Sequence, residues 1–370
     1  MARRIGCVLI LLVLASGAFL FTSCGTIRAG RMVLDATRPA SELAPYVTES
    51  ELAVGAVGGR VPTRIYRPVD TDGALPAIVL VHGAVTGGAD EPRFVALARA
   101  MAKRGATIAT PDLASLRRFR LDRSDPERVA AAACALANRS DLTRDGRVAL
   151  VGISVGGSYC LLAARDPRLA GRVSTILSFG AYADLDGLVR RWMTDPRSDA
   201  PELLDPQTYG RRMVLHGNLD ILVPPDDVTP VRDVIARLLN DQSPGDVPPE
   251  LSPAGRRVVE VAISEDAIDP AVVADLLRPL EAGIRGLSPV RRDEVPDAPV
   301  YLLHGVRDPV VPVADLERLA VHLRDRGVDV ETHETDVFGH VKRTGEGHPS
   351  LFEAWPLFSF LADVWSDAGF

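Results

Sequence analysis

Short apolar runs alternate with amphipathic stretches along most of the chain. The continuous apolar run at Ala77–Val81 predicts a strand that is buried on both faces, as in a parallel sheet, and Ala106–Thr110 and Val173–Ser178 are predicted as further strands. The stretches at Arg93–Arg104 and Pro126–Asn138 have the spacing of amphipathic helices. Strands that alternate with helices predict an α/β fold, in which helices cover both faces of a mostly parallel sheet.

This alternation is interrupted between Asp184 and Asp293. The pattern there predicts mainly helices, with one strand-like run at Met213–His216 and frequent prolines in the connections. We therefore expect a core made of residues 46–183 and 294–370, and a helical cap or lid insertion at 184–293. The insertion is expected to hold helices at 228–240, 253–263 and 270–283, and the core to add a hairpin at 51–67, strands at 300–303 and 328–332, and helices at 313–326 and 349–365.

A serine lies where a strand gives way to a helix. The apolar run Val148–Val151 leads into Gly152-Ile-Ser-Val-Gly156, and an Ala/Leu-rich helical pattern follows from Ser158. Glycines two residues before and two after Ser154 let strand and helix approach closely, so that a strained turn can lift the hydroxyl clear of both. The pattern predicts that Ser154 is a nucleophile. The alternative is a serine that only caps a helix.

A serine nucleophile needs a base, and the base needs an acid that orients it. On sheets of this type the chain order is serine, acid, histidine. The other histidines lie at earlier strand ends, in a helix or beside the last strand, whereas His340 follows that strand on a loop from which it can reach Ser154. We predict His340 as the base, with His348 on the same loop as the fallback.

Two aspartates compete for the acid. The segments Leu215–Pro224 and Leu303–Pro312 both contain His-Gly, an aspartate three residues after the glycine, and a Val-Pro pair. Asp308 follows the strand that comes just before the one leading to His340, so it is the predicted acid. Asp220 is the alternative acid.

Two backbone N–H groups are expected to stabilise the oxyanion of the reaction. One belongs to Val155, directly after the nucleophile. The other is expected from the glycine-rich loop after Ala77–Val81, with Ala84 as the first candidate and Gly83 as the second.

With these motifs, the chain from about Leu75 to Phe370 resembles an α/β-hydrolase. The Leu-His-Gly-x-x-Asp-x-x-Val-Pro segment at 303–312 and the late Gly339-His340 are similar to those of dienelactone-hydrolase-like and prolyl-oligopeptidase-like members. The resemblance implies an eight-stranded, mostly parallel sheet with Ser154, Asp308 and His340 at its carboxyl edge. It also implies a serine hydrolase whose substrate choice lies largely in the inserted cap.

The N-terminus resembles a bacterial export signal. Arg3 and Arg4 precede an apolar stretch at 5–21, and Phe21-Thr-Ser-Cys24 resembles a lipobox, with phenylalanine where leucine is usual. We predict a signal peptide at 1–23, lipidation of Cys24, a tether at 24–45, and a membrane-anchored place on the exported side of the cell envelope. An uncleaved signal anchor and ordinary secretion are the alternatives.

Composition and motif spacing limit which partners and cofactors are expected. The formal net charge of −7 does not predict a nucleic-acid-binding protein. No Cys/His spacing resembles a zinc site, and the run at 152–157 departs from the Gly-x-Gly-x-x-Gly dinucleotide pattern, so neither a metal nor a cofactor is expected. Cys134 and Cys160 are expected to be buried thiols, although an oxidising compartment would permit them to pair.

These features predict an enzyme that cleaves carboxylic esters of small molecules or lipids through an acyl-enzyme on Ser154. A serine peptidase or an acyltransferase of the same fold would use the same residues. An alternative of another class is a non-catalytic binding lipoprotein of the envelope, because a fold does not guarantee chemistry.

Overall fold

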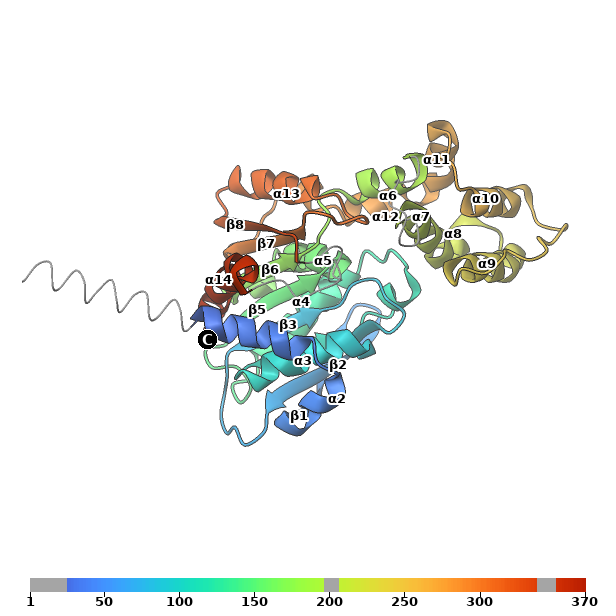
Figure 1. The fold of residues 1–370 in the computed structure, drawn as a ribbon. Coiled ribbons are helices and arrows are strands. Elements are labelled where there is room, and N and C mark those ends of the chain that lie inside the picture. The colour runs from blue at the N-terminus through green and yellow to red at the C-terminus, as the bar shows by residue number, and fades with distance from the viewer. Residues whose placement is uncertain (1–24, 196–205, 338–350) are drawn as a thin grey trace, which may run out of the picture.

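The computed structural model describes residues 25–195, 206–337 and 351–370. Its sheet has eight strands in the order β1-β2-β4-β3-β5-β6-β7-β8 (Figure 1). The strands are β1 (Val47–Ala56), β2 (Gly59–Pro68), β3 (Ala77–Val81), β4 (Thr107–Pro111), β5 (Val148–Ile153), β6 (Val173–Phe179), β7 (Val300–Gly305) and β8 (Val330–Thr335). Strand β2 is antiparallel to both of its neighbours, and the pairings from β4 to β8 are parallel. The predicted mostly parallel sheet is confirmed.

Helices cover both faces of this sheet. One face carries α3 (Pro92–Lys103) and α14 (Leu351–Asp367), and the other carries α4 (Asp125–Ala137), α5 (Val155–Ala163) and α13 (Ala314–Arg324). Because successive side chains of a strand point to opposite faces, Ile78 and Leu80 of β3 pack under the first group, and Val79 and Val81 pack under the second. All four side chains are fully buried, which explains the unbroken apolar run in the sequence.

The segment after the predicted lipidation site is part of the fold. Residues 25–36 form a helix, which is followed by α2 (Ala40–Leu43) and the 3₁₀ turn η1 (Ala44–Tyr46). Gly30 lies so close to α14 that a Cβ there would be 3.0 Å from the Phe358 ring. The predicted irregular tether at 24–45 is therefore wrong for its described part. Within the described ranges, no helix has the length and apolar composition that crossing a bilayer requires.

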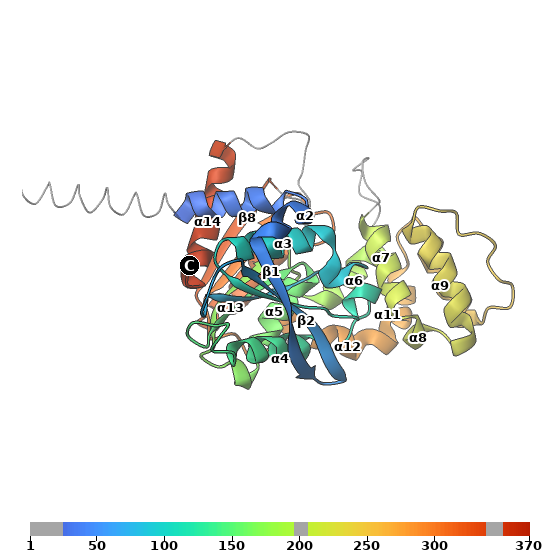
Figure 2. The same ribbon diagram turned by 90° about the horizontal axis from the view of Figure 1, so that it is seen from below.

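The insertion is mainly helical, as predicted. It comprises α6 (Leu185–Thr194), α7 (Pro206–Gly217), α8 (Leu219–Leu222), α9 (Pro225–Leu239), α10 (Pro253–Ile263), α11 (Pro270–Leu277), α12 (Glu281–Gly286) and the 3₁₀ turns η5 (Arg278–Leu280) and η6 (Pro289–Arg291). Figures 1 and 2 place these helices together at one end of the molecule, beyond the sheet. The strand predicted at Met213–His216 is wrong, because these residues lie inside α7. A run of three apolar residues, Met213–Leu215, fits a buried helix as well as a strand.

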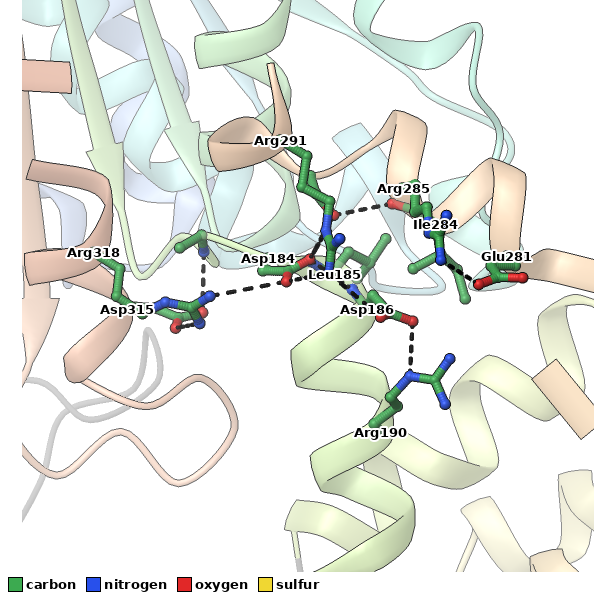
Figure 3. A network of polar contacts seen from close by, with 12 residues as sticks. Asp184, Leu185, Asp186, Arg190, Glu281, Ile284, Arg285, Arg291, Asp315 and Arg318 are labelled. Carbon is green, nitrogen blue, oxygen red and sulfur yellow. Dashed lines mark hydrogen bonds and ion pairs between the residues drawn. The ribbon is translucent and has the colours of Figure 1, made fainter. Parts of the chain in front are cut away.

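The two chain segments that lead into and out of the cap are bound to each other (Figure 3). The Asp184 carboxylate accepts hydrogen bonds from Arg291 Nε (2.9 Å), Arg291 Nη2 (2.8 Å) and Ser288 Oγ (3.0 Å). These contacts between Asp184, Ser288 and Arg291 form a clamp between the two segments. Just before Asp184 in the chain, the Ala183 N–H donates to Asp315 of α13 (3.0 Å) and holds the entry segment on the core. Burial alone would raise the pKa of Asp184, but the bonds from Arg291 and Ser288 outweigh it and hold that pKa below its usual range.

The two cysteines within the described ranges are not bonded to each other. Cys134 is half-buried, whereas Cys160 is buried within α5. Burial raises the pKa of the Cys160 thiol far above its ordinary value, so it stays protonated and packs as a small apolar group.

Replacement of Asp184 by asparagine should lower the free energy of unfolding by about 2–3 kcal/mol at neutral pH, because it removes the charge partner of Arg291. The control is Arg190→Gln, which removes an ion pair between residues four apart on α6 and should change the stability by less than about 0.5 kcal/mol. Urea unfolding measures both variants.

The effect of Asp184→Asn should also depend on pH. Because the folded pKa of Asp184 is depressed, its stabilisation is present above the unfolded pKa of about 3.9 and is lost as the pH falls below that value. The difference between wild type and Asp184→Asn should therefore shrink near pH 3. A difference that is unchanged there, or an equal loss in Arg190→Gln, would contradict the clamp.

Candidate active site

Ser154 occupies a strained turn between β5 and α5. Its φ of 54° and ψ of −125° lie outside the regions that residues other than glycine commonly adopt. Such a conformation costs about 1–3 kcal/mol and persists only where the surroundings fix it. The Ser154 N–H donates to the Phe179 carbonyl at the end of β6 (2.7 Å), which ties the turn to the neighbouring strand.

Close backbone packing surrounds this turn, and glycines make it possible. A Cβ on Gly152 would overlap the carbonyl of Gly156. A Cβ on Gly156 would lie 2.6 Å from the carbonyl oxygens of Val81 and His82, at the end of β3. Real Cβ atoms do not approach backbone this closely, so α5 can begin directly above β5 and against β3 only if both positions are glycine.

The predicted oxyanion residues come together at this turn. Val155 is the first residue of α5. A Cβ on Gly83 would lie 3.3 Å from Ser154 Cβ, so the loop after β3 passes directly beside Ser154. Ala84 of the same loop lines a cavity together with Ser154 and Val155. The structure thus places all three predicted residues next to Ser154.

Asp308 lies on the loop after β7, and its side chain is fully buried. Its Oδ1 accepts hydrogen bonds from the N–H groups of Val310 (2.8 Å) and Val311 (2.9 Å), and its Oδ2 lies 3.4 Å from Nε2 of His304. Val310 and Val311 line the same cavity as Ser154, so the Asp308 turn forms part of the wall of the candidate site.

The alternative acid, Asp220, lies elsewhere. It belongs to α8 of the cap, where its half-exposed side chain forms an ion pair with Arg120 (2.8 Å). The segments around Asp220 and Asp308 are alike in sequence but not in structure. His216 and Gly217 end the helix α7, whereas His304 and Gly305 end the strand β7. His340, the fallback His348 and Cys24 lie outside the described residues.

A cavity of about 120 Å³ opens beside Ser154, between the core and the cap. Its walls are almost entirely apolar. The core contributes Leu116, Phe119, Leu121, Tyr182, Val310 and Val311, and the cap contributes Leu185, Leu188, Trp192, Tyr209, Met213 and Val214. Helices α6 and α7 therefore close the site from above, as expected for an insertion that selects substrates.

Known proteins resemble the chain mainly in structure. The model of the secretory lipase family matches residues 282–355, and no curated protein matches the sequence. Dipeptidyl peptidase 4 of Porphyromonas gingivalis is 12% identical, with a TM-score of 0.52 over 87% of this chain and 36% of its own. Acylaminoacyl peptidase of Pyrococcus horikoshii is 14% identical, with a TM-score of 0.51 over 87% and 42%. A hyperthermophilic esterase of Pyrobaculum calidifontis is 18% identical, with a TM-score of 0.49 over 93% and 91%.

The strand order, the turn at Ser154 and the two structural matches above 0.5 agree on one architecture. The chain has the α/β-hydrolase fold. It spans less than half the length of the two peptidases, so their likeness concerns the fold alone. The match to the secretory lipase family is confined to residues 282–355, so it does not assign the whole chain to that family.

One further residue shapes the site without being among the predicted site residues. His82 is buried at the end of β3, where its Nδ1 donates to the Gly83 carbonyl (2.8 Å) and its Nε2 accepts the Leu113 N–H (3.0 Å). Burial, the largest effect, holds the pKa of His82 below its usual range, so the ring is neutral and each nitrogen keeps its role. His82 thereby fixes the Gly83-Ala84 backbone beside Ser154. The sequence feature that could have indicated this role is the position of His82 directly before a glycine at the end of a predicted strand.

Substitution of Gly156 by alanine should abolish activity and lower the melting temperature, because the added methyl group would strike two carbonyl oxygens of the β3 end. The matched control is Gly55→Ala, since Gly55 lies in β1 with no atom within 4 Å of the added Cβ. Ester hydrolysis and thermal unfolding of both variants test this packing. If Gly156→Ala keeps near-wild-type activity and stability, the close approach of α5 to β3 is not required.

Proposed function

We propose that this α/β-hydrolase is a serine hydrolase that cleaves carboxylic esters through an acyl-enzyme on Ser154. The observation that carries the proposal is the left-handed backbone of Ser154 at the mouth of an apolar cavity. Strain of this kind is stored at functional sites, and a serine with a purely structural role has no need of it.

In the proposed reaction, Ser154 Oγ attacks the ester carbonyl while His340 takes its proton. Asp308 orients the imidazole and stabilises its charged form, as the acid of such a triad does. The N–H groups of Val155 and Ala84 receive the oxyanion. The alcohol leaves with the proton from His340. His340 then takes a proton from a water molecule as that water attacks the acyl-enzyme, and Ser154 leaves with the proton. The loop geometry at Asp308 and Ala84 supports these assignments.

The cavity favours esters with a short apolar acyl group. Its volume of about 120 Å³ is below the roughly 300–1,000 Å³ of ordinary small-molecule sites. Leu188 and Met213 of the cap are buried in its wall and limit its length. A peptidase that holds several residues of a substrate would need more room, which ranks the peptidase alternative lower. An acyltransferase would form the same acyl-enzyme and differ only in the acceptor.

We further propose that the enzyme works in the cell envelope and is anchored through a lipid on Cys24. The lipobox-like sequence before Cys24 carries this proposal, and the match to a family of secretory lipases supports export. The envelope binding lipoprotein without activity remains the competing function, and the labelling experiment below separates the two.

A fluorophosphonate should label the native protein at a single serine, and peptide mapping should find the label on Ser154. Ser154→Ala should lose all labelling and all hydrolysis of short aryl esters, whereas Ser243→Ala, which changes an exposed serine of the cap, should keep both. An unlabelled, folded wild type would favour the non-catalytic lipoprotein.

Asp308→Asn should reduce kcat/KM by about 10³–10⁴, because the base would lose its orienting carboxylate. Asp220→Asn should stay within about threefold of wild type, because Asp220 forms a surface ion pair. Assay of both variants on 4-nitrophenyl acetate decides the acid. A large loss in Asp220→Asn alone would show that our assignment is wrong.

Leu188→Ala should extend the cavity and raise the ratio of kcat/KM for octanoyl over acetyl esters by tenfold or more, since each methylene in an apolar pocket is worth about 1–3 kcal/mol. Leu239→Ala, on α9 and outside the cavity wall, should leave the ratio unchanged. A panel of 4-nitrophenyl esters of increasing chain length provides the measurement. An unchanged preference in Leu188→Ala would mean that the acyl group binds elsewhere.

A further inference from the structure

A second and larger cavity lies away from Ser154. Its volume is about 360 Å³, within the roughly 300–1,000 Å³ of ordinary ligand sites. It lies between the helix at 25–36, α3 and α14, and Met32, Ile78, Met101, Trp365 and Phe370 form its apolar wall. Such a wall suits an apolar ligand.

The cavity begins where the described chain begins. Gly25 lines it, and a Cβ on Gly25 would lie 3.4 Å from Ala362 of α14, so the start of the helix is packed against the cavity wall. Cys24 precedes Gly25 directly, and neighbouring Cα atoms are about 3.8 Å apart. Cys24 is therefore one residue away in the chain from the cavity lining.

The rim of the cavity is polar and suits the ester groups of a glycerolipid. Ser359, Asp363 and Ser366 of α14 line the cavity together with Arg28 and Arg104, so two hydroxyl groups and two guanidinium groups are available as hydrogen-bond donors. Arg28 is held in place by a hydrogen bond from its Nη2 to the Arg104 carbonyl (3.2 Å). Ester carbonyls accept hydrogen bonds from such donors.

Two large apolar side chains of the helix at 25–36 are exposed to solvent. Ile27 and Leu34 are 47% and 55% exposed on the helix at 25–36. Both figures place this helix start and the C-terminus at the end of the molecule away from the cap. Exposed apolar side chains, with the exposed Arg28 and Arg31 beside them, suit a helix that lies at a bilayer surface.

We propose that this cavity holds one acyl chain of a diacylglyceryl group attached to Cys24. The proposal rests on the lipidation of Cys24 and is independent of catalysis at Ser154. In that modification, the Cys24 thiol displaces the phosphate headgroup of a phospholipid, a thioether forms to the diacylglycerol, and the thiol proton leaves with the headgroup.

An acyl chain bound in the cavity would also set the orientation of the protein on the membrane. The remaining acyl chains enter the bilayer beside Gly25, so the cavity end faces the membrane and the cap, with the site at Ser154, faces away from it. The enzyme then meets substrates dissolved in the aqueous compartment rather than lipids of its own membrane.

Photochemical crosslinking tests the proposal in the intact protein. Bacteria that produce the full chain are grown with a fatty acid bearing a terminal diazirine, irradiated, and the crosslinked peptides are identified by mass spectrometry. We expect the N-terminal lipid of Cys24 to be crosslinked to peptides that contain Met32 or Met101. Ala362→Phe, which fills the cavity, should lower this yield at least fivefold, whereas Ala282→Phe, on an exposed position of α12, should not change it.

The remaining outcomes would overturn the proposal. These are a Cys24 without acyl groups, crosslinks of Cys24 lipid to phospholipids alone, an Ala362→Phe yield equal to wild type, or crosslinks of a separate phospholipid to the cavity peptides. Thermal unfolding of Ala362→Phe verifies that it is folded. Ser154→Ala should give the wild-type crosslink pattern, which separates this cavity from the catalytic site.

Discussion

The approach of α5 to the end of β3 is the constraint on which the candidate site depends. Ser154 keeps its left-handed backbone because β5, α5 and the neighbouring loop pack closely around it. At Gly152 and Gly156 the backbones of these elements are too close for a side chain. The same approach brings Gly83 and Ala84 beside the serine and starts α5 at Val155. The positions of Ser154 and of the proposed oxyanion donors thus follow from a single packing contact, which His82 stabilises by its two hydrogen bonds.

The cap depends on this core in a different way. Its entry and exit segments are joined at Asp184, Ser288 and Arg291, so the insertion is attached through one polar clamp and through the apolar walls of the site. Because α6 and α7 supply much of the wall of the cavity at Ser154, the position of the cap sets the room for a substrate. The core provides the proposed chemistry, and the cap provides the proposed selectivity.

Sequence patterns predicted the parts of the molecule that are governed by local periodicity. Strand β3 and helix α10 have the predicted bounds, because a fully buried strand and a well-capped amphipathic helix leave clear signals. The helix at 25–36 was predicted as a tether because it directly follows the export signal, although the buried side chains of Thr26, Ala29 and Met32 have helical spacing. The role of His82 could not be predicted either, since it depends on Leu113, a residue brought close only by the sheet.

Covalent trapping of the acyl group tests the central claim most directly. The purified chain is mixed with 4-nitrophenyl acetate, quenched in acid within seconds and analysed by intact mass and peptide mapping. The account predicts up to one acetyl group per chain, carried by Ser154, and none in Ser154→Ala. Turnover of the ester without an acetyl group on Ser154, or with the group on another residue, would contradict it.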